Sequence, residues 1–364
     1  MSGEWPLASG NERLPHPDLA SKGMTVPTHH TPRGFRNPWP DAEPKGLRDV
    51  IRWSIQRRRQ TLAPDPAPGD FAVAEPLFEQ RERSNVLGAT WVGHSTVLLQ
   101  IGSTNVLTDP IWSERASPVQ FAGPKRFVAP AVDLDRLPPI DVVLISHNHY
   151  DHLDRWTIKQ LARSQPNIHW IVPLRLAPLL SKWGAASLRE LDWWNDLRLD
   201  TPGGSIEIAC VPAQHFSARG LGDRGRSLWG SWVIRGSGHA VYFAGDTAYH
   251  PEFGEIARRY GPFDLALLPI GAYEPRWFMR SVHMNPPEAL RAYGELAAAG
   301  GAPPIMLPIH WGTFRLTDES MSQPPEWIQR LWREAGYDPR LLWMLRHGET
   351  RRLVASVTKE PNPR

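Results

Sequence analysis

The sequence predicts a mixed α/β domain rich in strands, and three observations favour this fold class. Short apolar runs with β-branched residues recur along the chain, and several end directly before a histidine or an aspartate. Segments of helical periodicity lie between these runs, and several begin at proline or aspartate and end at glycine. No segment repeats with a period of about 20–50 residues, so a solenoid is not expected.

The chain begins with a region that we expect to be a flexible tail, because residues 1–36 are rich in proline, glycine and histidine and lack apolar periodicity. Residues 37–85 form an N-terminal extension in which segment 45–59 predicts a basic amphipathic helix. Its apolar face is made of Leu47, Val50, Ile51 and Ile55. Such a helix can lie on an anionic membrane, but it more commonly buries its apolar face on its own domain, and we expect the second arrangement.

Residues 86–355 form the main domain, and a C-terminal tail follows over 356–364. Glycine-containing turns predict two hairpins, which pair 96–101 with 105–107 and 229–234 with 239–244. Proline, aspartate and glycine at segment ends predict four helices, at 154–163 with Asp154 as N-cap, 174–183, 286–299 and 325–335.

The loop after the apolar run 141–145 is crowded with potential metal ligands. His147 and His149 are separated by one residue, so an extended backbone would point both rings the same way. Asp151 and His152 follow where the chain must turn, and they could face a second ion. Imidazole and carboxylate are the ligands that zinc prefers. A histidine-rich surface loop is the alternative, but the residue types and their spacing favour metal binding.

Three further residues stand in the same setting, each shortly after a strand-like run: His215, Asp246 and His310. Taken singly, each histidine could be structural and the aspartate could be an ordinary turn residue. A fold that aligns such strands would bring these side chains to one edge of its sheets. The repeated arrangement therefore predicts one shared site.

Composition limits the other function classes. The chain has 364 residues, 41% hydrophobic and 22% charged, as expected for a globular protein. Its net charge of +3 is too small to indicate nucleic-acid binding. The lone Cys210 excludes an internal disulfide and cysteine-rich zinc sites, and its apolar surroundings predict a buried side chain. Because we find no secretory signal or transmembrane stretch, we expect a cytoplasmic protein that is soluble or attached at a membrane surface.

The ligand series His-x-His-x-Asp-His, then His, Asp and His, resembles the pattern of the metallo-β-lactamase superfamily. Longer strings are similar to its N-acylphosphatidylethanolamine-hydrolysing phospholipase D family, from about residue 37 to Glu349. They include Leu107-Thr108-Asp109-Pro110-Ile111, Gly123-Pro124-Lys125-Arg126-Phe127, Leu228-Trp229-Gly230-Ser231-Trp232, Pro269-Ile270-Gly271-Ala272-Tyr273-Glu274-Pro275 and His310-Trp311-Gly312-Thr313-Phe314. Metal binding does not require these strings, so they are more specific than the ligands themselves.

The resemblance implies a metallo-β-lactamase αββα sandwich that holds two zinc ions, with iron or manganese as alternatives. One ion would be held by His147, His149 and His215. The other would be held by Asp151, His152 and His310, and Asp246 would bridge the pair. Asp151, His152 and Asp246 are accordingly the expected catalytic residues. The implied reaction is hydrolysis of N-acylphosphatidylethanolamine, or a related phospholipid, to an N-acylethanolamine and phosphatidate by a hydroxide that both metals activate.

Four more residues are expected near this site. Metal-bound imidazoles need a partner for their remote N–H group, and Asp109 and His94 are the best candidates for that supporting role. Tyr150 and His283 match positions that contact the substrate phosphate in the family. The family also implies a phospholipid partner, and it raises a homodimer and peripheral membrane contact as further expectations. Most of the 17 tryptophans should lie in the core, and some could line an acyl-chain pocket.

Three alternatives stay open. The same fold could hydrolyse a lactone, a sugar phosphate or a nucleotide phosphodiester, because fold does not determine substrate. A flavin-partnered diiron redox protein shares the scaffold, but it normally has a carboxylate where His149 stands. A binding protein without catalysis is disfavoured because all seven ligands are present.

Overall fold

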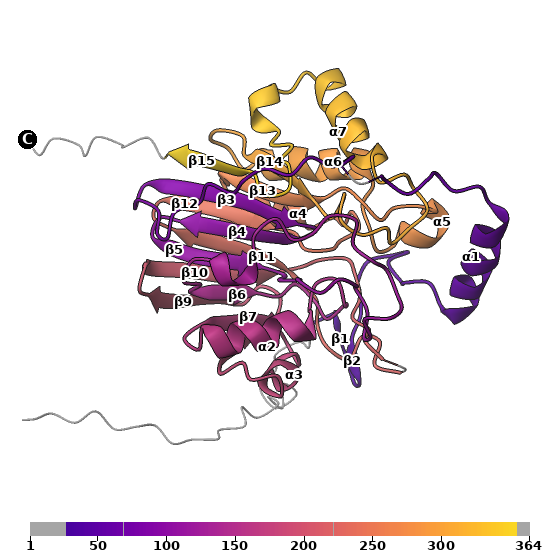
Figure 1. The fold of residues 1–364 in the computed structure, drawn as a ribbon, viewed down its shortest axis with the longest axis horizontal. Helices are drawn as coiled ribbons and strands as arrows, with labels where there is room; N and C mark the ends of the chain where they lie inside the picture. Colours follow the sequence, from indigo (N-terminus) through magenta and orange to yellow (C-terminus); the bar gives the residue numbers. More distant parts are fainter. Residues whose placement is uncertain (1–26, 68, 221, 355–364) are drawn as a thin grey trace, which may run out of the picture.

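Two β-sheets pack face to face between helices in the computed structural model, which describes residues 27–354 except positions 68 and 221 (Figure 1). Within this part of the chain, one sheet has seven strands in the order β15-β3-β4-β5-β6-β7-β8. Their bounds are β3 (Val86–Gly93), β4 (Thr96–Ile101), β5 (Thr104–Thr108), β6 (Val142–Leu144), β7 (His169–Pro173), β8 (Ser187–Leu191) and β15 (Thr350–Val354). Strands β15 to β5 pair antiparallel, and β5 to β8 pair parallel.

The second sheet has six strands in the described residues, in the order β14-β13-β12-β11-β10-β9. Their bounds are β9 (Asp196–Thr201), β10 (Gly204–Val211), β11 (Ser231–Gly236), β12 (His239–Phe243), β13 (Leu265–Pro269) and β14 (Ile305–Ile309). Strands β9 to β12 are antiparallel, whereas β12, β13 and β14 are parallel.

Helices cover the outer faces of both sheets (Figure 1). On the first sheet lie α2 (Arg155–Ser164) and α3 (Ala177–Ser181), and on the second lie α4 (Phe253–Tyr260), α6 (Pro286–Ala297) and α7 (Gln323–Glu334). The N-terminal helix α1 (Leu47–Arg59) lies apart from these layers. Short elements complete the fold: α5 (Arg276–Met279), η2 (Leu134–Arg136), η3 (Pro339–Leu341), β1 (His30–Thr31) and β2 (Gly34–Phe35).

Within the described residues, three large apolar cores hold these layers together, beside one small cluster around Ile111 and Phe314. The largest lies between the sheets and includes Trp91 and Trp232, one from each sheet, both without exposed area. A second core joins the six-stranded sheet to its helices, and a third joins the seven-stranded sheet to α2. Strands buried on both faces read as continuous apolar runs, as β13 and β14 do. The expected αββα sandwich is therefore confirmed.

Most local predictions agree with the structure. Both hairpins form, as β4–β5 and β11–β12, and the Asp154 carboxylate caps α2 by accepting from two backbone N–H groups. Cys210 is buried as expected. The helix predicted over 174–183 is shorter, because Arg175 has a left-handed φ of 69° and α3 begins only at Ala177.

The predicted flexible tail over 1–36 is wrong for its last ten residues. Within residues 27–36, β1 and β2 pair as a small hairpin, and the Phe35 ring is buried in the core between the sheets. The pattern missed this because one aromatic ring and a two-residue pairing leave no periodicity to detect. Residues 1–26 and the predicted C-terminal tail over 356–364 lie outside the described part of the chain.

Helix α1 forms where expected, but it docks by the opposite face from the one predicted. Trp53 packs on Phe278 with ring centroids 5.0 Å apart, and its indole N–H donates to Asp318 at 2.7 Å. The Arg57 guanidinium lies 3.2 Å from the same carboxylate. The aliphatic face stays in solvent, with exposed fractions of 74% for Leu47, 39% for Val50, 51% for Ile51 and 46% for Ile55. Among the described residues, no helix is both long and apolar enough to cross a membrane.

Candidate metal centre

All seven predicted ligands and both supporting residues lie at one edge of the two sheets. They follow the C-terminal ends of six strands: His94 follows β3, Asp109 follows β5, the 147–152 loop follows β6, His215 follows β10, Asp246 follows β12 and His310 follows β14. The pairing makes β3, β5 and β6 run in one direction in their sheet, and likewise β10, β12 and β14 in theirs. Strands that run in the same direction end at the same edge of their sheet. The strand topology therefore brings these side chains together at that edge.

The backbone at this edge is held in unusual conformations. His94, Asp109 and His310 have left-handed φ values of 55°, 32° and 61°, which non-glycine residues adopt rarely and which cluster at functional sites. Gly245, before Asp246, has a φ of 59°, and a Cβ there would lie 2.4 Å from the Cβ of Ser146. Only glycine therefore lets the Asp246 loop approach the histidine loop this closely.

Three imidazoles converge in one half of the cluster. The Nδ1 atom of His149 lies 2.8 Å from Nε2 of His147 and 3.1 Å from Nε2 of His215. Burial and the neighbouring imidazoles lower the pKa of His147 well below its usual range, and the pKa of His149 to about 3. The pKa of His215 falls to about 4, again chiefly through burial. All three rings are neutral at physiological pH, which is the form that binds metals.

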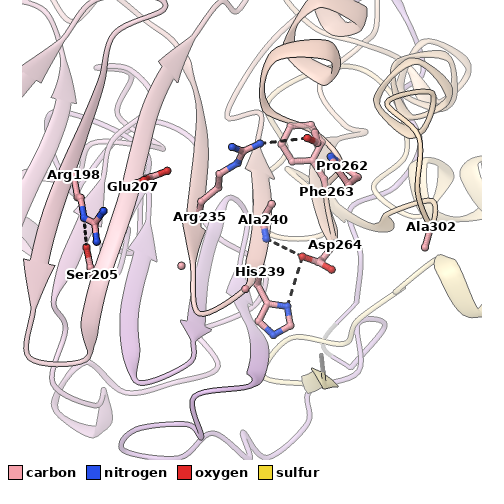
Figure 2. Close-up of a pocket in the computed structure, with 13 residues that line it drawn as sticks. Arg198, Ser205, Glu207, Arg235, His239, Ala240, Pro262, Phe263, Asp264 and Ala302 are labelled. Atoms are coloured by element: carbon pink, nitrogen blue, oxygen red, sulfur yellow. Dashed lines mark hydrogen bonds and ion pairs between the residues drawn. The ribbon is translucent and has the colours of Figure 1, made fainter. Parts of the chain in front are cut away.

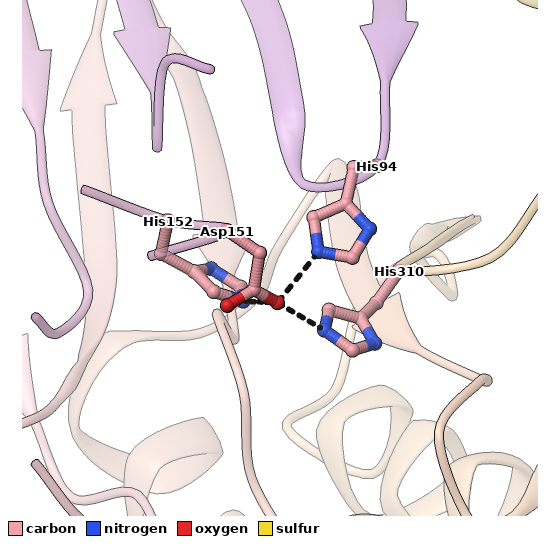
Figure 3. Close-up of side chains that lie close together, drawn as sticks. All are labelled: His94, Asp151, His152 and His310. Atoms are coloured by element: carbon pink, nitrogen blue, oxygen red, sulfur yellow. Dashed lines mark hydrogen bonds and ion pairs between the residues drawn. The ribbon is translucent and has the colours of Figure 1, made fainter. Parts of the chain in front are cut away.

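The other half is built around the Asp151 carboxylate (Figure 3). Its Oδ2 atom lies 3.3 Å from Nε2 of His152 and 3.4 Å from Nε2 of His310. Nε2 of His94 is a third ring nitrogen near the same oxygen, at 2.9 Å. The structure thus places His94 against the side chain of a candidate ligand, where it can orient that carboxylate or bind an ion itself.

Asp246 lies between the two halves. Its Oδ2 atom is 3.1 Å from Nε2 of His152 and 3.8 Å from Nε2 of His215, and its Oδ1 atom is 3.2 Å from Nε2 of His310. One carboxylate therefore faces both groups of rings. This is the position that a residue shared by two ions would need.

The donor set fits a pair of divalent cations. Within the described residues, the Nε2 atoms of His152 and His310 and the Oδ1 atom of Asp246 are buried without a hydrogen-bond partner. Unpaired buried polar atoms are costly, and coordination by a cation would satisfy all three. The five imidazoles and two carboxylates are also the donor types of zinc sites.

The Nδ1 atoms of His152 and His215, on the side of each ring away from the cluster, have hydrogen-bond partners. Asp109 Oδ2 lies 2.7 Å from His152 Nδ1, and the same carboxylate accepts from the backbone N–H and the hydroxyl of Ser146. The Nδ1 atom of His215 lies 2.8 Å from the Val282 carbonyl, to which it donates in the tautomer that leaves Nε2 free. Such partners fix the tautomer and orientation of metal-binding imidazoles.

Two histidines of the cluster, His310 and His152, have raised pKa values, unlike the three in the other half. Burial alone would lower the pKa of His310, but Asp246 and Asp151 more than offset it and raise the pKa to about 9. The pKa of His152 also stays well above its usual range, because Asp246, Asp151 and Asp109 outweigh its burial. Without metal, these two rings hold protons where cation charge would otherwise balance the carboxylates.

The two predicted substrate contacts lie differently. His283 is 91% buried, and its Nδ1 atom is 3.9 Å from Asp246 Oδ2, with no hydrogen-bond partner among the described residues. Burial lowers the pKa of His283 well below the usual range, so the ring is neutral at physiological pH. The Tyr150 hydroxyl instead donates to the Arg219 carbonyl at 2.7 Å. Its hydroxyl proton is therefore engaged by the loop that carries Arg219.

Three further residues, which the sequence motifs did not indicate, also shape the site. Ser146, directly before His147, joins Asp109 to the His147 ring through its hydroxyl. The Arg219 guanidinium donates to the carbonyls of Asn148 and Leu153 and so holds both ends of the histidine loop. Asn37 donates to the His215 carbonyl. Ser146 could have been inferred from its position in the motif, but no pattern links Asn37 or Arg219 to residues so distant in sequence.

Two cavities deserve comparison. One of ≈ 490 Å³ lies beside the β11–β12 hairpin, lined by Arg235, His239 and Asp264 among others, and none of its residues belongs to the ligand cluster (Figure 2). The other, of ≈ 760 Å³, adjoins the histidine loop through Tyr150. Its walls include Trp112, Trp156 and Trp183. Of these two cavities, the second is the better candidate for substrate binding.

Known proteins resemble this chain in sequence and fold. A family model described as a β-lactamase superfamily domain matches residues 104–311. The N-acyl-phosphatidylethanolamine-hydrolyzing phospholipase D 1 of Caenorhabditis elegans is 41% identical over 67% of this chain and 69% of its own length. An uncharacterized protein of Mycobacterium tuberculosis is 42% identical over 76% of this chain and 71% of its own. The solved structure of Igni18, a metallo hydrolase from Ignicoccus hospitalis, is similar in fold (TM-score 0.56, 22% identity), covering 74% of this chain and 100% of that one.

Proposed function

Because this chain belongs to the N-acylphosphatidylethanolamine-hydrolysing phospholipase D family of the metallo-β-lactamase superfamily, we propose that it hydrolyses N-acylphosphatidylethanolamine or a closely related phospholipid. It is a metal-dependent hydrolase. The observation that carries the proposal is the position of Asp246 between two groups of ring nitrogens. The chain that holds this arrangement is 41% identical to the N-acyl-phosphatidylethanolamine-hydrolyzing phospholipase D 1 of Caenorhabditis elegans. The products would be an N-acylethanolamine and phosphatidate.

Two zinc ions are the proposed cofactors, with His147, His149 and His215 around one and Asp151, His152 and His310 around the other. Asp246 would be shared. When bound, the ions would supply Lewis-acid chemistry, lowering the pKa of a water and balancing charge on the phosphoryl oxygens. The protein contributes the rest by holding the ligand rings in fixed tautomers, through Asp109 for example.

His283 and the cavity at the histidine loop are the proposed substrate contacts. The neutral His283 ring can donate one N–H to a phosphoryl oxygen bound beside the ligand cluster, without adding charge to the cluster. The cavity at the histidine loop combines the Trp112, Trp156 and Trp183 rings with the cations Arg155 and Lys159. Aromatic walls with a basic rim suit a lipid whose acyl chain is apolar and whose phosphate is anionic.

A lipid panel tests this proposal directly. We expect the purified, zinc-loaded protein to release N-acylethanolamine from N-acylphosphatidylethanolamine and to leave lactones and cyclic nucleotides intact. In water enriched in oxygen-18, the label should enter the phosphatidate, because the P–O bond to the ethanolamine oxygen is the one broken. Label in the alcohol would contradict this mechanism. Turnover of a lactone or a nucleotide without lipid hydrolysis would favour the alternative substrates.

We also propose that α1 rests on the surface of an anionic phospholipid membrane. Its solvent-exposed aliphatic face lies beside Arg58 and Arg59, two exposed cations at the end of the helix. The helix is anchored through Asp318, in the loop that follows β14 and His310, so it flanks the sheet edge that bears the ligand cluster. An apolar face next to arginines suits a bilayer with negative headgroups.

Replacing both Ile51 and Ile55 with glutamate should weaken binding to phosphatidylserine-containing vesicles at least about tenfold, since each buried aliphatic side chain contributes about 1.5–3 kcal/mol. Vesicle co-sedimentation measures the effect. Leu77→Glu is the control, because Leu77 is even more exposed than Ile51 and Ile55, at 66%, but lies outside α1. Unchanged binding of the double variant would rule out this role for α1.

A further inference from the structure

An N-terminal segment crosses the loop that carries His215. We call residues 29–42 the strap. The Asn37 side-chain amide uses both of its N–H groups, donating to the His215 carbonyl at 2.9 Å and to the Ala42 carbonyl at 2.7 Å. In the described part of the chain, no other group donates to the His215 carbonyl. Asn37 thus connects the strap to the main chain of a candidate metal ligand.

The strap is anchored on both sides of this contact. The Phe35 amide donates to the Gly225 carbonyl at 2.7 Å, farther along the same loop. Gly34 fits so closely there that a Cβ would lie 2.0 Å from the Gly225 oxygen. On the other side of Asn37, the Trp39 ring stacks on His250 at 4.8 Å and on Trp193 at 5.7 Å.

A third anchor joins the start of the strap to the turn after β8. The Nε2 atoms of His29 and His30 lie 2.7 Å from the two oxygens of Asp192, one ring to each oxygen. The His29 ring also stacks on Trp193 at 4.3 Å. With both ends held, the strap has little freedom to move Asn37 away from His215.

From these contacts we infer that the strap is part of the metal centre and that Asn37 is a positioning residue for His215. The His215 ring is oriented by Val282 on its Nδ1 side, but its backbone lies in a loop outside the sheet ladder. Asn37 fixes that backbone from a segment outside the matched domain, which begins at residue 104. The inference rests on the proposed metal site, and it adds that the site is incomplete without the strap.

Zinc affinity of the full-length protein tests the inference without any substrate. Asn37→Leu keeps the approximate volume and removes both donors. We expect it to weaken one zinc site by about 10–100-fold, the loss typical of an outer partner, in competition with a chromophoric chelator. Thr31→Val is the matched control: it removes another hydrogen bond of the strap, from the Gly34 amide, but has no contact with His215. That variant should bind zinc like the unmodified chain.

Equal zinc affinity in the Asn37 variant and the unmodified protein would overturn the inference, and so would an equal loss in the Thr31 variant. Failure of the unmodified protein to bind zinc would instead overturn the proposed function. The two failures are therefore distinguishable.

Hydrogen exchange on the unmodified protein provides a test that does not depend on a variant folding. Linkage is reciprocal, so if the strap supports the zinc site, zinc must stabilise the strap. We expect zinc to slow exchange of the Phe35 and Arg36 amides more than that of Gly236, at the far end of β11. Equal or no change at the two places would contradict the inference.

Discussion

Asp246→Asn is expected to abolish hydrolysis, with a loss well beyond the ~10–100-fold typical of removing an outer partner of a metal ligand. The amide keeps the shape of the carboxylate but cannot supply its charge to both halves of the cluster. His152 and His310, which lie 3.1 and 3.2 Å from Asp246, would face a neutral group. We expect the variant to retain at most one tightly bound zinc ion, measured by elemental analysis alongside the lipid assay.

Asp264→Asn is the control for this experiment. Asp264 pairs with the β12 backbone in the cavity beside the β11–β12 hairpin, away from the ligand cluster. That variant should hydrolyse lipid at the rate of the unmodified protein. If Asp246→Asn kept both zinc ions and most of its activity, Asp246 would not be a shared ligand and the proposed two-metal site would be wrong.

Zinc binding is expected to release protons and to tighten as pH rises toward about 9. In the metal-free protein, Asp246 and Asp151 overcome the effect of burial and raise the pKa of His310 to about 9, and the pKa of His152 is raised as well. Both rings are therefore protonated at physiological pH, whereas a metal binds only the neutral ring. Affinity should increase about tenfold per pH unit for each proton displaced.

The sign follows from the two pKa values of His310. The folded, metal-free protein holds this proton more tightly than the unfolded chain, in which the pKa is 6.5. The proton thus stabilises the metal-free fold fully below about pH 6.5, and this contribution is lost as the pH rises through about 9. Over the same pH range the proton competes less strongly with the metal for His310, so the zinc affinity increases.

Calorimetry in buffers of different protonation enthalpy counts the released protons. A His310→Gln variant, which has no titrating ring at this position, should release about one proton fewer than the unmodified protein. A binding heat independent of buffer near pH 7 would contradict the prediction. So would a zinc affinity that stays constant between about pH 7 and pH 9.

Much of the fold could be predicted because its information is local. The β4–β5 hairpin follows from Gly102 and Ser103 between two apolar runs, and the start of α2 follows from the Asp154 side chain. The short pairing of β1 with β2 escaped prediction because its stability comes from Phe35 in a distant core. Local pattern also misplaced the docking face of α1, because one distant carboxylate, Asp318, selects the polar side.

The candidate site divides in the same way. The sequence alone determined which side chains could bind metal, because each follows an apolar run and carries an imidazole or a carboxylate. Their surroundings follow from the three-dimensional fold: Asp109 beside His152, Val282 and Asn37 bonded to His215, and the charges that keep a proton on His310. Ligand type is a property of single residues, whereas orientation and charge depend on groups that the chain brings together from more than 30 positions away.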